Sequence, residues 1–124
     1  MNTFQNLIVW QKSHELVLKI YEATKNFPKE EIYGITNQIR RASYSIPANI
    51  AEGRKKKTQK HKINFLSHSE GSLEEVKYFL ILSKDLQYIS NEIFLQLFNC
   101  AEEIGKLISG YEKFLKQNNK PNPL

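Results

Sequence analysis

The sequence predicts an all-α protein, built as one antiparallel up-down-up-down four-helix bundle that spans residues 1–124 as a single domain. Apolar residues recur every three or four positions through four long segments, which is the period of an amphipathic helix. No segment shows the sustained alternation of apolar and polar residues that marks a half-buried strand. The connections between the segments are short, and short connections between long helices make neighbouring helices antiparallel.

The first helix is expected over about residues 7–26. Its apolar stripe includes Trp10 and also takes in His14, so we expect His14 to face a core or an interface. Phe27 is followed by Pro28, and a residue before proline is pushed out of the α region of backbone space. The first helix is therefore expected to end just before Phe27.

The second helix is expected over about residues 30–52. Glu30 and Glu31 stand in its first turn, where the positive end of the helix dipole favours negative charge. Gly53 follows the last apolar turn, and a glycine just past a helix is a common stop signal because it adopts the left-handed conformation without strain. We therefore expect Gly53 to end this helix.

Pro47 lies inside the second segment, where a proline removes one hydrogen bond and clashes with the preceding turn, at a cost of about 3 kcal/mol. Either the helix stops and restarts, with Ser45 capping the new turn, or one helix continues with a kink. Ile46 and Ile50 keep the spacing set by Ile39, whereas a break would shift that phase. The spacing favours a continuous, kinked helix.

The last two helices are expected over about residues 58–86 and 91–117, with Ser90 as the N-cap of the later one. Small residues such as Ser69 interrupt the middle of the earlier helix, and small side chains let a neighbouring backbone come close. Residues 118–124 form a polar tail that contains two prolines, and we expect this tail to be frayed.

Two patterns predict that the chain associates with copies of itself. A stripe of Gln, Arg, Ser and Asn side chains is typical of a hydrogen-bonding surface between helices, and the second helix carries one at Gln38, Arg41, Ser45, Asn49 and Glu52. Large apolar residues beside the main seams have no obvious room inside one bundle, and surplus apolar surface indicates subunit contacts. These surplus residues are Val9, Leu16, Phe65, Phe79, Ile81, Phe94 and Phe98.

The most basic stretch is RKKKTQKHK at residues 54–62, in a chain of net charge +5. Such a cluster is typical of a sequence-independent contact with phosphates, and the alternative is a solvated loop that leads into a helix. Lysines at a helix N-terminus oppose the dipole, which favours a functional reason for them. No aromatic residue interleaves the run, so base stacking is not predicted. The candidate nucleic-acid-binding residues are Arg54, Lys55, Lys56, Lys57, Lys60 and Lys62.

Motifs for catalysis, metal binding and cofactor binding are absent from the sequence, and we predict no enzyme, metal site or cofactor. His14, His61 and His68 lack the spacing of metal ligands. Cys100 is the single cysteine, which excludes an internal disulfide and fits a reducing cytoplasm. No apolar run approaches the roughly 20 residues of a membrane span, and the first residues lack a signal-peptide pattern. We therefore expect a cytoplasmic protein with no membrane partner.

The tracts QIRRASYSIPANIAEG and GSLEE resemble the family of proteins encoded within intervening sequences of bacterial 23S ribosomal RNA genes. The resemblance extends over nearly all of residues 4–115 and implies a four-helix bundle that assembles into a pentameric ring. A related protein is the accessory variability determinant of diversity-generating retroelements, a basic pentamer that binds nucleic acid and works with a reverse transcriptase. The resemblance brings no catalytic residues. It implies that the signature positions are bundle or subunit contacts: Gln38, Arg40, Arg41, Ser45, Pro47, Asn49, Glu52 and Gly53.

Together these observations predict a non-enzymatic oligomeric adaptor, with a homopentamer favoured by the resemblance, that presents a basic surface to RNA or DNA. The alternative is a protein–protein assembly module with no direct role on nucleic acid. Its partner would be a reverse transcriptase or another neighbouring gene product, docked on the sides or ring faces of the bundle.

Overall fold

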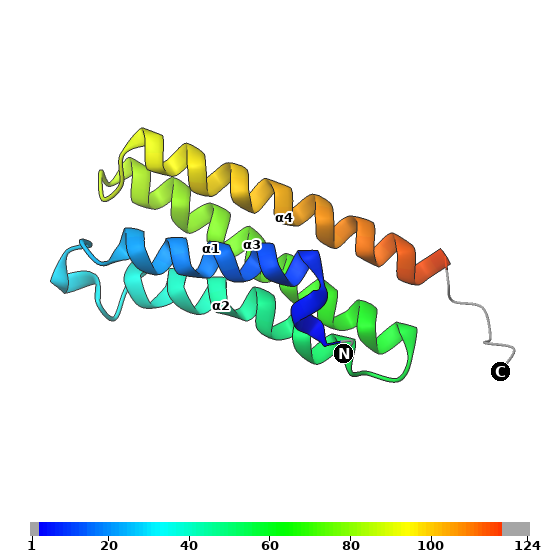
Figure 1. The fold of residues 1–124 in the computed structure, drawn as a ribbon. Coiled ribbons are helices and arrows are strands. Elements are labelled where there is room, and N and C mark those ends of the chain that lie inside the picture. Colours follow the sequence, from blue (N-terminus) through cyan, green and yellow to red (C-terminus); the bar gives the residue numbers. More distant parts are fainter. Residues whose placement is uncertain (1–2, 118–124) are drawn as a thin grey trace, which may run out of the picture.

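Residues 3–117 are described by the computed structural model, and they form four α-helices with no strand in that range (Figure 1). The helices are α1 (Ile8–Thr24), α2 (Ile35–Arg54), α3 (Gln59–Asp85) and α4 (Asn91–Gln117). Short 3-10 turns cover Phe4–Asn6 and Lys29–Glu31. The predicted all-α class with four helices is confirmed for these residues. The predicted polar tail at 118–124 lies outside the described residues.

Each α-helix packs against two others, α1 and α3 each lying against both α2 and α4. The connections 25–34 and 86–90 meet at one end of the bundle, and the connection 55–58 lies at the opposite end, as does the first 3-10 turn (Figure 1). At the first end the Tyr88 hydroxyl donates a hydrogen bond of 2.8 Å to the Glu31 carboxylate. This bond ties the two connections together.

The core is a continuous apolar column to which all four helices contribute. Aliphatic side chains spaced three or four residues apart face inward along each helix, as the sequence period predicts. The most deeply buried of them have at most 2% of their surface exposed, and they are Leu16, Ile20, Ile39, Ile46, Ile50, Leu73, Val76, Leu80, Ala101, Ile104 and Ile108.

The predicted surplus of apolar residues is partly wrong. Val9, Leu16 and Phe94 are buried in the core, and of the remaining predicted residues only Ile81 is exposed. His14 is exposed and stacks on Trp10 with ring centroids 5.1 Å apart, so it does not face the core. Other apolar side chains are exposed instead, namely Ile8, Leu18, Tyr21, Ile32, Tyr33, Tyr44, Tyr78, Leu86, Ile93, Leu95 and Phe114. The rotation of each helix about its axis decides which side of a wide stripe is covered, and spacing alone does not fix that rotation.

The second helix begins at Ile35 and not at residue 30, so the predicted start is wrong. Gly34 has φ −108° and ψ −121°, a backbone conformation outside the helical region, which separates the 3-10 turn Lys29–Glu31 from α2. Glu31 still serves the helix N-terminus, because its carboxylate accepts a hydrogen bond of 3.4 Å from the backbone N–H of Ile35. The first helix likewise ends two residues early, at Thr24. At α4 the predicted cap is confirmed, since Ser90 Oγ accepts from the Ile93 N–H over 3.1 Å.

Pro47 is buried within α2, which runs through it as one helix. The predicted continuity is therefore confirmed. The carbonyl just before the proline receives support from the neighbouring helix, because Ser69 Oγ on α3 donates a hydrogen bond of 2.9 Å to the Ile46 oxygen. Ser69 is fully buried, and its small side chain allows this close approach of the α3 side chain to the α2 backbone.

Gly53 does not stop α2 in the predicted way. It lies inside the helix, which continues to Arg54, and its φ is not positive. A Cβ atom added at Gly53 would come within 2.6 Å of the Phe65 Cβ and 3.6 Å of the Lys62 carbonyl oxygen. The absence of a side chain at this position is thus needed for the close packing of α2 on α3.

Candidate nucleic-acid interface

The basic residues lie at the end of the bundle where α2 passes into α3 (Figure 1). The connection 55–58 carries three consecutive lysines. Thr58 ends it as the N-cap of α3, its hydroxyl accepting from the His61 N–H over 3.2 Å. The cap fixes the start of α3 in spite of the unfavourable lysines nearby.

The six predicted basic residues are not equally accessible. Lys55, Lys57 and Lys60 are exposed, whereas Arg54, Lys56 and Lys62 are half-buried. Among the described residues, none of the six forms an ion pair, and the ion pairs present join other lysines to glutamates. The exposed lysines therefore carry charge that no acidic side chain of the described chain neutralises.

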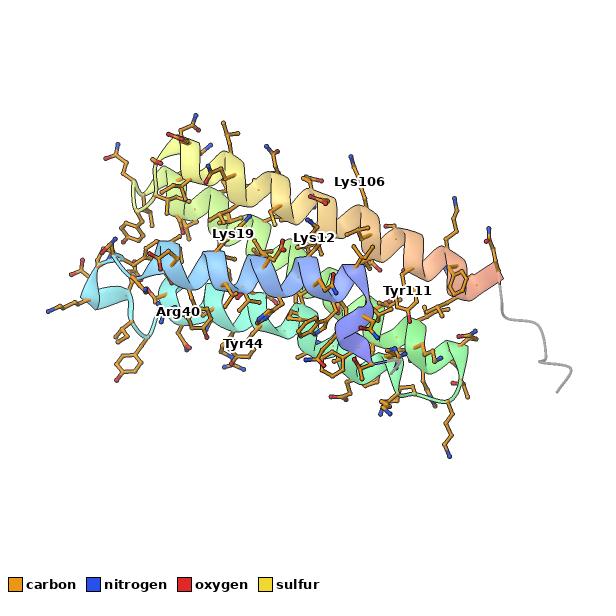
Figure 2. All side chains as sticks on the ribbon, in the orientation of Figure 1. Lys12, Lys19, Arg40, Tyr44, Lys106 and Tyr111 are labelled. Carbon is orange, nitrogen blue, oxygen red and sulfur yellow. The ribbon has the colours of Figure 1, made fainter. Side chains whose placement is uncertain are left out.

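Arg54 and Lys62 face inward, toward α4. They line a small hollow together with Gly53, Tyr111 and Leu115. Burial raises the pKa of the Tyr111 phenol, and the positive charge of Arg54 partly opposes that rise. Figure 2 shows Tyr111 toward the end of α4 that lies beside the α2–α3 connection. These two half-buried cations therefore lie beside α4, and they reach the outer surface less than the three exposed lysines do.

An aromatic pair that sequence reasoning missed lies beside the lysines. The Lys56 ammonium stands 5.0 Å from the centroid of the Phe65 ring. The imidazole of His68 meets the same ring edge-on, with centroids 5.7 Å apart and planes at 66°. Phe65 lies nine positions after Lys56 in the sequence, so it does not interleave the basic run, but the fold of α3 against α2 brings the two together.

A polar groove runs between α2 and α3 on the side of the bundle. It encloses about 320 Å³ and is lined by Gln38, Arg41, Ala42, Ser45, Ser72 and Glu75. The Ser45 and Ser72 hydroxyls lie 2.9 Å apart across it. Asn49 donates from Nδ2 to the Ser45 carbonyl over 2.8 Å and to its hydroxyl over 3.0 Å. Of the predicted stripe, Ser45 therefore bridges α2 and α3 of one chain, and Asn49 supports it with hydrogen bonds within α2.

The other predicted contact residues are placed differently. Arg40 points away from the groove toward α1, where its Nε donates to the Thr24 hydroxyl over 2.8 Å and its guanidinium lies 4.5 Å from the Tyr21 ring centroid (Figure 2). Gln38 and Arg41 line the groove as exposed residues. Glu52 is exposed and lies outside the groove lining. The predicted contact residues thus divide into an α1 contact, a groove and an outer surface.

The sequence pattern of the family described as 23S rRNA-intervening sequence protein matches residues 5–110. The chain belongs to this family. It is also similar to the crystal structure of a protein with unknown function from the S23 ribosomal protein family of Bacteroides thetaiotaomicron, with a TM-score of 0.77 and 29% sequence identity. That similarity covers 86% of this chain and 99% of the other. No curated protein matches the chain.

Within this member of the 23S rRNA-intervening sequence family, no trio of His, Cys, Asp or Glu among residues 3–117 is arranged to hold a metal ion. Cys100 is half-buried, and desolvation raises the pKa of its thiol, which disfavours the reactive thiolate. Burial and the nearby Glu112 carboxyl on α4 raise the pKa of Glu70 on α3, while Lys116, which forms an ion pair with Glu112, lowers the pKa of Glu112. No helix in the described part of the chain is both long and apolar enough to span a bilayer.

Proposed function

We propose that this family member is a non-enzymatic oligomeric bundle protein that presents its lysine-rich end to RNA or DNA. One observation carries the proposal: Lys55, Lys57 and Lys60 are exposed together at one end of the bundle, and none is ion-paired within the described residues. A compact group of unpaired cations attracts a polyphosphate backbone and releases its counterions. The single cysteine, Cys100, fits a protein of the reducing cytoplasm, and nucleic acid is present in that compartment.

We propose further that neighbouring helices of the bundle run antiparallel. Several copies of the chain then assemble into an oligomer, with a pentameric ring favoured. The cross-helix contacts support the antiparallel arrangement, since Ile46 of α2 meets Ser69 and the later Gly53 meets the earlier Phe65. Exposed apolar side chains support assembly, with Ile8 62% and Leu18 57% exposed on α1. Assembly around an axis would gather several lysine-rich ends on one face and multiply their attraction for a polyanion.

Replacement of Lys55, Lys57 and Lys60 together by glutamine is expected to weaken binding of RNA by at least about tenfold near physiological salt. Each lost phosphate contact removes one counterion-release step, so the slope of log affinity against log salt should also become shallower by about 2 to 3. Fluorescence anisotropy with labelled RNA over a series of salt concentrations measures both quantities. Circular dichroism should report unchanged helix content, because all three side chains are exposed.

The matched control replaces Lys19, Lys29 and Lys106 by glutamine. These lysines are also exposed, and the change in net charge is the same, but they lie outside the α2–α3 end of the bundle. The control should retain most of the affinity and nearly the full salt slope. Equal losses of RNA affinity in both variants would show that binding depends only on the net charge of the protein. A wild-type protein that binds neither RNA nor DNA at low salt would contradict the proposal.

The alternative function, a protein–protein assembly module, is favoured by the groove between α2 and α3. Its rim carries exposed side chains of opposite charge, Arg41 and Glu75, beside a network of hydroxyls. Such a surface suits a polar protein segment, and the proposed partner is a reverse transcriptase or another neighbouring gene product. Light scattering with and without RNA separates the two functions. The adaptor should form an oligomer that gains mass with RNA, whereas an assembly module should keep its own mass and bind its protein partner equally after the lysine replacements.

A further inference from the structure

We infer that the lysine-rich end binds single-stranded nucleic acid, with one base stacked at the Phe65–His68 pair while the neighbouring lysines hold phosphates. The inference rests on the proposed function and adds to it the class of ligand. A charged groove or rim alone would accept duplex and single strand alike. Stacking on a side chain requires a base that is splayed out of its own helix, which a single strand offers readily.

The geometry of the Phe65–His68 pair supports the stacking of a base. The Phe65 ring is anchored on one side, because its Cβ packs directly against Gly53 of α2, where an added Cβ would lie only 2.6 Å away. His68 follows three residues later on α3, one turn along the helix, and is exposed while its ring contacts the Phe65 edge. The pair is therefore a supported aromatic surface that reaches solvent, and its order does not depend on a flexible loop.

The positions of the charges fit the same ligand. Lys56 already holds its ammonium 5.0 Å from the Phe65 ring centroid, where it interacts with the ring face. A lysine stem is long and mobile, so an arriving base can take the place of that ammonium over the ring, and the ammonium can then pair with the phosphate of the same nucleotide. Lys55 and Lys57, the exposed neighbours of Lys56 in the chain, are placed to contact the adjoining phosphates.

The first test uses the unaltered full chain. Anisotropy compares a labelled oligothymidylate with an abasic strand that has the same number of phosphates and no bases. Stacking of one base should make the oligothymidylate bind at least about fivefold more tightly. Equal affinity for the two strands would overturn the stacking inference while leaving the proposed function intact. Absence of binding to either strand and to duplex would overturn the proposed function itself.

The second test asks whether the preference for the strand with bases depends on the Phe65–His68 pair. Phe65→Leu and, separately, His68→Ala should bring the ratio of the two affinities close to one, with binding of the abasic strand little changed. Tyr78→Leu is the control, because Tyr78 is exposed and its ring lies 5.6 Å from that of Phe79 on the same helix. Tyr78 follows the Phe65–His68 pair by about 15 to 20 Å along the α3 axis, away from the lysines. If Phe65→Leu lowers the melting temperature, His68→Ala still decides, since its exposed side chain carries little of the fold. An unchanged ratio in His68→Ala and in a folded Phe65→Leu would remove the pair from the site.

Discussion

Ile104→Ala is expected to lower the free energy of unfolding by about 2–5 kcal/mol, more than any other single substitution predicted for this protein. Ile104 is completely buried on α4, within the column of side chains that all four helices share. Truncation to alanine removes the transfer free energy of three carbons and leaves a cavity that rigid neighbouring helices fill only in part. Urea denaturation followed by circular dichroism measures the loss.

Ile93→Ala is the matched control, because Ile93 lies on the same helix and is 39% exposed. Its replacement should cost much less, well under half of the loss at Ile104. Both variants are compared at one protein concentration, since the stability of an oligomer depends on the concentration of its subunits. Similar losses at the two positions would show that Ile93 is covered by another chain, or that α4 is rotated from the orientation described.

Gly53→Ala is expected to destabilise the protein by about 1–3 kcal/mol, although alanine is the better helix former. The new methyl group would lie 2.6 Å from the Phe65 Cβ, an atom attached directly to the α3 backbone. A flexible side chain cannot relieve that contact by turning away. The two helices must separate instead, and their packing at the lysine-rich end must loosen.

Two other glycines provide a direct comparison. Gly71 on α3 and Gly110 on α4 also lie inside helices, and an added Cβ at either would meet nothing within 4 Å. Gly71→Ala and Gly110→Ala should therefore stabilise the protein, by up to about 1 kcal/mol each. Thermal and urea unfolding of the three variants should give opposite signs. A neutral or stabilising Gly53→Ala would contradict the close packing of α2 on α3.

The helices were predictable because helix formation depends on features that repeat locally. Ser90 and Ile93 illustrate this at α4, where a capping hydroxyl and the N–H three residues later lie together in the sequence and form the bond that the sequence suggests. Pro47 illustrates it too, since the spacing of apolar residues on both sides indicated one continuous helix. Local sequence patterns do not show which residues from distant parts of the chain come into contact, and the features that depend on such contacts were not predictable.

Three points depended on contacts between distant residues. The start of α2 is set by Gly34 and by Glu31, which bonds to Tyr88 from a different connection. The role of Gly53 follows from Phe65 on the next helix. The candidate base-stacking surface was not predictable for the same reason, because the basic run contains no aromatic residue and the fold supplies one from outside it.

The amino-acid order alone determined the number of helices, the inward aliphatic seams and the concentration of lysines between the second and third helices, because each is a property of neighbouring residues. The tertiary structure alone decided that Phe94 is buried while Ile32 is exposed, and which of the lysines in the basic run reach solvent. Those outcomes depend on the rotation and separation of whole helices. Rotation and separation are set by the sum of many side-chain contacts, the glycine contact of α2 with α3 among them.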